Sequence, residues 1–155
     1  MNNIRDATDG AAETIPDGFA PHARKSPLTD PWEPLYSKVV DGALVLGVRI
    51  RQALCNGRGF AHGGLISALA DSAMGHSVVG AIRRRGGNPS SAAVTVTLTV
   101  DFLGSGQIGQ WLEVVPRVLR AGSNLGFADC LVLADGQPIA RGSATFRVFS
   151  SADRD

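Results

Sequence analysis

Hydrophobic residues repeat along this chain with two different periods. From residue 92 to residue 103 they alternate with polar residues, so that Val94 to Val100 would form one face and the intervening threonines the other. A period of two predicts a β-strand with faces of opposite polarity. From residue 63 to residue 82 apolar side chains recur at helical spacing, which predicts one long helix.

Further apolar runs are separated by turn residues. Asp41-Gly42 and Asp135-Gly136 each lie between two apolar runs, a pattern typical of tight hairpins. One early helix followed by a run of antiparallel strands predicts an α+β fold, with the helix packed on one face of a curved antiparallel sheet. Besides 92–103, the expected strands cover residues 36–40, 43–51, 110–120, 125–134 and 137–149.

The pattern divides the chain into three parts. Residues 1–31 hold several prolines and mixed charges, and we interpret them as a flexible or loosely packed arm. Residues 32–150 carry the periodic patterns and are predicted to form one domain, followed by a disordered tail at 151–155. The first 30 residues contain no apolar run long enough for a signal peptide or a membrane span, so we expect a cytoplasmic protein.

The balance of charge narrows the classes of function. The formal net charge is +1, which does not point to nucleic acid or an anionic membrane as a partner. Only 19% of residues are charged, against 44% hydrophobic, so we expect a partner subunit to cover part of the surface. The two cysteines and three histidines lack metal-ligand spacing, so reduced thiols and no metal are expected.

The segment between residues 56 and 71 holds the candidate chemistry. Gly63 and Gly64 open the predicted helix, so backbone N–H groups are exposed at its positively polarised start. Asp71 follows in an otherwise apolar segment, where an unpaired buried carboxylate would be costly. Together they suggest a site that handles a polarised carbonyl. The alternative is that Asp71 is an ordinary solvated aspartate at the edge of the helix, which has the same position in the sequence pattern.

Helical geometry predicts where this carboxylate lies. At about 100° per residue, one broad packed stripe runs from Leu65 to Ser77. Asp71 falls on the flank of that stripe, together with Ser67, Met74 and Val78. We therefore expect an apolar acyl pocket lined by this flank and by the long strand.

The spacing Asn56-x5-His62-Gly63-Gly64-x6-Asp71 resembles a known family. It is similar to the hotdog-fold acyl-CoA thioesterases of the type that includes bacterial phenylacetyl-CoA thioesterases, within the 4-hydroxybenzoyl-CoA thioesterase superfamily. The resemblance implies a hotdog fold, an acyl-CoA substrate that brings its own coenzyme A and needs no further cofactor, and a homodimer that pairs into a homotetramer. It covers roughly residues 32–149, including Pro34-Leu35-Tyr36, Asp101-Phe102-Leu103 and the final hairpin from Asp135.

The resemblance also implies roles for single residues. The Gly63 N–H would hold the carbonyl oxygen, and Asp71 of the other subunit would act as base or nucleophile. Asn56 and Thr95 would orient the water or the carbonyl, although a Gly-rich turn and β-propensity also account for these residue types. His62 would either frame the helix start or take part directly.

Contacts to the substrate follow from the same resemblance. Gly64 has no side chain to block the thioester, and Ser67 and Met74 would line the acyl pocket. Arg83 and Arg120 are candidates for the phosphates of coenzyme A, because arginine suits phosphate geometry. Each of these arginines can equally be a solvated surface charge.

Two other functions fit parts of the pattern. A hotdog enoyl-CoA hydratase or dehydratase would pair an aspartate with a histidine. Asp71 and His76 lie about 140° apart around one helix, however, and are not expected to converge. A non-catalytic acyl-CoA-binding hotdog protein would leave Asp71 idle. We expect instead the hydrolysis of an aryl- or medium-chain acyl-CoA to free acid and CoA.

Overall fold

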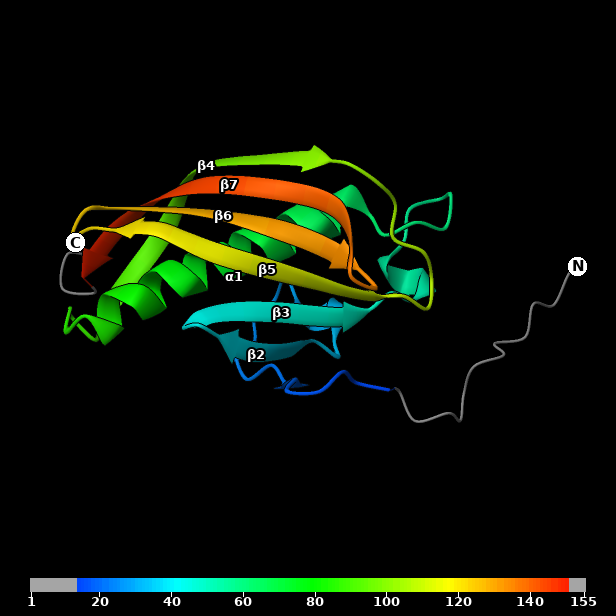
Figure 1. The fold of residues 1–155 in the computed structure, drawn as a ribbon, viewed down its shortest axis with the longest axis horizontal. Coiled ribbons are helices and arrows are strands. Elements are labelled where there is room, and N and C mark those ends of the chain that lie inside the picture. The colour runs from blue at the N-terminus through cyan, green and yellow to red at the C-terminus, as the bar shows by residue number, and fades with distance from the viewer. Residues whose placement is uncertain (1–13, 151–155) are drawn as a thin grey trace, which may run out of the picture.

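The computed structural model describes residues 14–150, which form one long α-helix and a seven-stranded sheet (Figure 1). Residues 1–13 of the predicted arm and the predicted tail at 151–155 lie outside the described residues. The helix α1 spans Gly63–Arg84. The strands are β1 (Ala20–Pro21), β2 (Tyr36–Val40), β3 (Ala43–Arg49), β4 (Ser91–Phe102), β5 (Trp111–Ala121), β6 (Leu125–Ala134) and β7 (Gln137–Ser150).

The sheet curves around α1 as in a hotdog fold. Its strands are antiparallel and follow the order β1-β2-β3-β5-β6-β7-β4, so β1 and β4 are the edges. Figure 1 shows α1 lying along the concave side. The predicted α+β class, the single helix and the hairpins are confirmed. Asp41 and Asp135 both have positive φ and are followed by glycines with positive φ, as two-residue hairpin turns require.

The two ends of α1 have different chemistry. His62 caps the first turn, because its Nδ1 accepts a hydrogen bond of 2.9 Å from the N–H of Gly64. Arg83 and Arg84 lie in the last turn, where cations favour the negative helix end. Gly86 follows with φ 77°, and the N–H of Gly87 bonds to the carbonyl of Ile82 at 3.0 Å. By length and hydropathy α1 could also cross a membrane, but half of that stretch is buried inside the sheet.

The core forms where α1 meets the concave face of the sheet. Met74 and Val78, predicted on the flank, are fully buried there. Gly126 in β6 makes room for Val78, since a Cβ there would lie 2.3 Å from it, whereas a Cβ on Gly142 in β7 would make only an ordinary contact with Met74 at 3.5 Å. The flank assignment was therefore wrong for these two residues, because the curved sheet covers more of the helix than one stripe.

A β-bulge in β4 reverses the side on which residues point. Thr95 pairs with the buried Phe146 and Leu98 pairs with the buried Ala144, so one strand advances three residues while the other advances two. Directly opposed residues share a face, and the extra residue, Val96, shifts the alternation. Thr95 thus faces α1 together with Leu98. The strict alternation predicted for residues 92–103 is wrong at this point.

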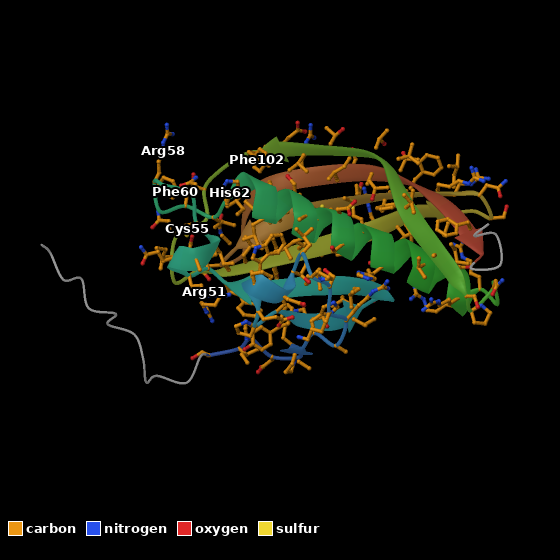
Figure 2. All side chains as sticks on the ribbon, turned by 180° about the vertical axis from the view of Figure 1, so that it is seen from behind. Arg51, Cys55, Arg58, Phe60, His62 and Phe102 are labelled. Carbon is orange, nitrogen blue, oxygen red and sulfur yellow. The ribbon has the colours of Figure 1, made fainter. Side chains whose placement is uncertain are left out.

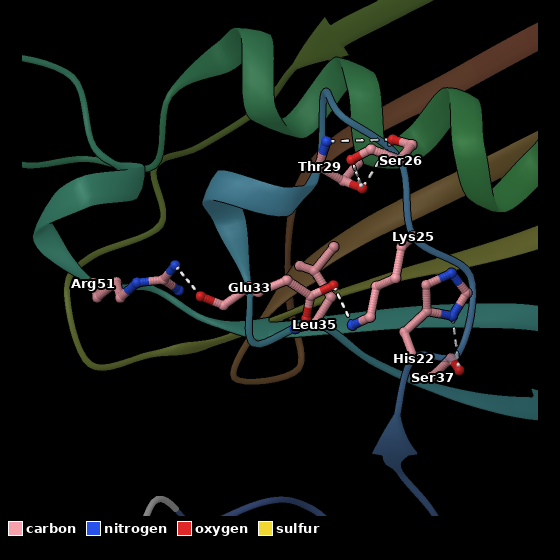
Figure 3. Close-up of polar contacts among 8 residues, drawn as sticks. All are labelled: His22, Lys25, Ser26, Thr29, Glu33, Leu35, Ser37 and Arg51. Atoms are coloured by element: carbon pink, nitrogen blue, oxygen red, sulfur yellow. Dashed lines mark hydrogen bonds and ion pairs between the residues drawn. The ribbon is translucent and has the colours of Figure 1, made fainter.

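Residues 22–35, which we call the N-terminal loop, pack against the domain (Figure 3). The N–H of His22 bonds to the carbonyl of Leu35 at 2.8 Å and closes the loop at its base. An ion pair of 2.6 Å joins Lys25 to Glu33 within it. His22 is 9% exposed, and its ring lies 6.1 Å from that of His76 on α1. Between Ala20 and Pro31 His22 is buried, whereas most of the other side chains are exposed.

We predict that Leu69→Ala lowers the free energy of unfolding by about 2–5 kcal/mol, because Leu69 is buried at the centre of the α1–sheet contact and its loss leaves a cavity. Urea denaturation at one fixed protein concentration measures this. Leu28→Ala is the control, since Leu28 is 65% exposed and the change should cost less than about 0.5 kcal/mol. Equal effects of the two substitutions would contradict the assigned core.

Candidate active site

The amino end of α1 presents a free backbone donor. Within residues 14–150 the N–H of Gly63 has no hydrogen-bond partner, whereas the N–H of Gly64 is taken by His62. Figure 2 shows His62 and Phe102 gathered at this end of the helix. A Cβ on Gly63 would lie 3.2 Å from the ring of Phe102, so a glycine fits this close approach. The free N–H at a positive helix end suits a developing oxyanion.

Asn56 shapes the loop that leads to this helix start. Its Oδ1 accepts hydrogen bonds from the N–H of Arg58 at 2.9 Å and of Phe60 at 3.3 Å. These are the contacts of an Asx-type turn, as expected for an asparagine in a Gly-rich loop. In the described part of the chain its Nδ2 donor has no recorded partner, so the amide N–H₂ remains available for a ligand.

Asp71 and Thr95 form a second group. The Thr95 hydroxyl donates a hydrogen bond of 2.6 Å to Oδ1 of Asp71. The contact joins α1 to β4 and exists because the bulge at Val96 turns Thr95 toward the helix. Asp71 is half-buried, so its second oxygen can still reach a ligand. A hydroxyl donor orients the carboxylate that accepts its hydrogen bond.

One protomer does not bring the two groups together. Gly63 and Asp71 lie eight residues apart on one helix, which separates them by about 12 Å along its axis. A carbonyl oxygen at the Gly63 N–H is therefore out of reach of Asp71 in the same chain. The groups can act on one carbonyl only if they come from different copies of the chain.

A pocket of about 490 Å³ opens beside Asp71, between α1, the start of β4 and the N-terminal loop. We call it the Asp71 pocket. Thr95 and Phe146 also line it. Its lining is more polar than that of the apolar pocket expected from the sequence. Six further polar or basic side chains line it: Arg24, Ser72, His76, Arg83, Ser90 and Ser91.

The other residues that were predicted to contact the substrate do not all lie in the Asp71 pocket. Ser67 is half-buried, and its hydroxyl donates to the carbonyl of Gly63 at 2.9 Å, which occupies that donor within the helix. Met74 lies in the core. Arg83 reaches the Asp71 pocket and bonds the carbonyl of Ser91 at 3.2 Å. Arg120 lies on β5 opposite Phe127 and is not part of that pocket's lining.

His76 is an addition that the sequence pattern did not predict. It lines the same pocket as Asp71, although the two were expected to point apart. Among the described residues its Nδ1 is buried without a hydrogen-bond partner. Burial, then the charge of Arg24 and the neighbouring His22, lowers the pKa of His76 below its ordinary value, so the ring is neutral at pH 7.

The cysteines offer neither a nucleophile nor a metal ligand. Burial raises the pKa of Cys130 to about 11 and also raises that of Cys55, so both remain thiols near neutral pH. Among residues 14–150, no three His, Cys, Asp or Glu side chains are close enough together to hold a metal ion.

The architecture is that of the hotdog thioesterases. A hypothetical thioesterase from Streptococcus pneumoniae, solved with coenzyme A, superimposes with a TM-score of 0.66 at 21% identity, covering 77% of this chain and 91% of that one. The Escherichia coli PaaI protein from the phenylacetic acid degradation operon superimposes with a TM-score of 0.61 at 24% identity, covering 70% of this chain and 74% of that one. At such identities the likeness establishes the fold alone.

Sequence relatives establish the family. The sequence model of the thioesterase superfamily matches residues 58–140, which include Gly63, Asp71 and Thr95. The Pseudomonas aeruginosa protein PA0474, which carries an esterase name, is 37% identical over 135 residues, covering 86% of this chain and 97% of PA0474. The chain therefore belongs to the thioesterase superfamily, and the protein is a thioester hydrolase.

We predict that the folded state loses stability as the pH falls below about 6.5, the ordinary pKa of histidine. His22 and His76 have lowered pKa values in the folded protein, mainly through burial, so the unfolded chain binds more protons in this range. Urea denaturation between about pH 5.5 and 7.5 measures the slope. His76→Gln should make the slope shallower, and an unchanged slope would contradict the assignment.

Proposed function

We propose that the protein hydrolyses an acyl-CoA to the free acid and CoA in a site shared by two subunits. The observation that carries the proposal is the separation of Gly63 from Asp71 by about 12 Å on one helix. Each helix then contributes one half to each of two sites. The partner subunit's Gly63 holds the carbonyl oxygen, and Asp71 acts on the carbonyl carbon. An aryl or a medium-chain acyl group is the proposed substrate class.

The hydrolysis balances with these groups alone. Asp71, oriented by Thr95, accepts a proton as a water oxygen bonds to the carbonyl carbon. The negative charge that develops on the carbonyl oxygen is stabilised by the partner subunit's Gly63 N–H. The carbon–sulfur bond then breaks, and the proton on Asp71 passes to the departing thiolate of CoA. Direct attack by the Asp71 carboxylate, followed by water, gives the same products.

The open edge of the sheet supports the shared site. β4 pairs only with β7, and its outer edge is unpaired over twelve residues among those described. Val94 and Val96 on this edge are 54% and 58% exposed. A long unpaired edge with exposed apolar side chains is a template for another strand. We propose that two copies of β4 pair in a homodimer, which joins the two sheets.

We predict that Asp71→Asn lowers kcat for acyl-CoA hydrolysis by about 10² or more, because the amide cannot accept the proton. A thiol reagent that detects free CoA measures this over a panel of acyl-CoAs. Retained binding of acyl-CoA by the variant separates lost chemistry from lost affinity. Turnover like that of the native protein would remove Asp71 from catalysis.

The shared site makes a sharper prediction with Gly63→Pro. Proline removes the N–H and suits the first position of a helix. The preceding residue, His62, has ψ 133°, a value that is allowed for a residue before proline. Gly63→Ala is the matched control, because it keeps the N–H and adds the same contact with Phe102. We expect Gly63→Pro to lose most activity and Gly63→Ala to keep much more.

Mixing the two inactive variants tests whether the halves come from different subunits. When Asp71→Asn and Gly63→Pro chains are co-expressed, half of the dimers contain both chains and one intact site. Each of these mixed dimers has one intact site out of two, so about a quarter of the native activity should return, as two-fold symmetry requires. If the halves belonged to one chain, no activity would return.

Thr95 gives an independent prediction. Thr95→Val keeps the shape of the side chain and removes the hydroxyl that donates to Asp71, so we expect kcat/KM to fall by about tenfold. Thr95→Ser keeps the donor and should retain most activity. Equal activities of the Val and Ser variants would show that the hydrogen bond is not needed.

A further inference from the structure

The Asp71 pocket carries an excess of basic groups. Arg24, His76 and Arg83 line it, whereas Asp71 is the only acidic side chain in its lining. An apolar acyl chain would leave these groups without a partner inside the site. Their arrangement is unusual for a pocket that receives only hydrocarbon.

Most of the hydrogen-bonding capacity of these groups is unused. Arg24 makes no hydrogen bond or ion pair within the part of the chain that the structure describes, and Asp71 is bonded to Thr95 instead. Arg83 uses one nitrogen on the carbonyl of Ser91, which leaves the rest of its guanidinium available. The ring of His76 lines the same pocket, and its Nδ1 is buried. These groups give the pocket the hydrogen-bond donors that an anionic ligand requires.

We propose that this pocket selects acyl-CoAs whose acyl group ends in a carboxylate, and that Arg24 of the N-terminal loop is its specificity-determining residue. The inference rests on the proposed hydrolysis at Asp71. A guanidinium binds a carboxylate through two parallel hydrogen bonds and remains charged at any pH of interest. His76, neutral at pH 7, supplies one further polar contact to the acyl tail.

The dimensions favour an acyl group of about six carbons. His76 lies five residues beyond Asp71, roughly 7.5 Å along the axis of α1. An extended six-carbon diacyl chain spans on the order of 6 Å between its end carbons, from C–C bonds of about 1.5 Å. A thioester carbon beside Asp71 therefore places the distal carboxylate near His76 and the N-terminal loop.

The test compares hexanedioyl-CoA, linked through one carboxyl group, with hexanoyl-CoA, which has the same length and no carboxylate. We expect the native protein to prefer hexanedioyl-CoA by about tenfold in kcat/KM, since a site built for a polar group rejects the analogue that lacks it. Arg24→Gln should abolish this preference through KM and leave hexanoyl-CoA within about twofold of native. Arg147→Gln is the matched control, because Arg147 is exposed and pairs with Leu125 and Val94 away from the pocket.

The outcomes separate the inference from the proposed function. An equal rate for both substrates, or a faster rate for hexanoyl-CoA, would overturn the inference and leave acyl-CoA hydrolysis standing. If the native protein hydrolysed none of the acyl-CoAs in the panel, both the inference and the proposed function would be overturned. Phosphates of CoA are the other anion that Arg24 can bind, so the same acids are also tested as N-acetylcysteamine thioesters, which carry no phosphate. If Arg24→Gln slows both CoA thioesters alike and neither N-acetylcysteamine thioester, the anion is a phosphate and the inference is wrong.

Discussion

The fixed rise of the α-helix is the constraint on which the site depends. Because α1 is held straight along the concave face of the sheet, Gly63 and Asp71 keep their separation of about 12 Å whatever binds. Neither loop motion nor a change of rotamer can close that distance. In the proposed shared site, the polarising donor and the carboxylate come from different chains, and the unpaired edge of β4 is where we propose that the two chains pair.

A second constraint works across the sheet. The extra residue Val96 divides β4 into two halves, in which the side chains alternate between the two faces of the sheet in opposite phase. Without it, Thr95 would point away from α1, and the carboxylate of Asp71 would lose its hydroxyl partner. The bulge thus links the geometry of an edge strand to the orientation of a side chain on the helix. Bulges near active sites commonly re-aim side chains in this way.

The spacing of hydrophobic residues and the identity of the turn residues were sufficient to predict the class of fold, the span of α1 and both Asp-Gly hairpins, because these features depend on neighbours in sequence. The same local reasoning failed at Val96, since a bulge leaves no mark on an alternating pattern. It also failed for Met74, whose burial depends on how the distant strands curve over α1. Gly63 and Asp71 were predicted from the sequence pattern and given roles by the family resemblance, and Thr95 was predicted through that resemblance. Arg24 lies in a proline-rich segment with no periodic signal, and only the folded chain brings it near Asp71.

The N-terminal loop has a consequence for how this protein can change over evolutionary time. The superfamily match covers residues 58–140, which hold Gly63, Asp71 and Thr95, whereas Arg24 stands upstream of it. A surface loop tolerates substitution far better than a packed helix or a sheet. If Arg24 sets the substrate range as proposed, substitutions in this short segment change that range while Gly63, Asp71 and Thr95 stay intact. The proposed specificity residue and the proposed hydrolytic residues thus lie on different segments of a single small domain.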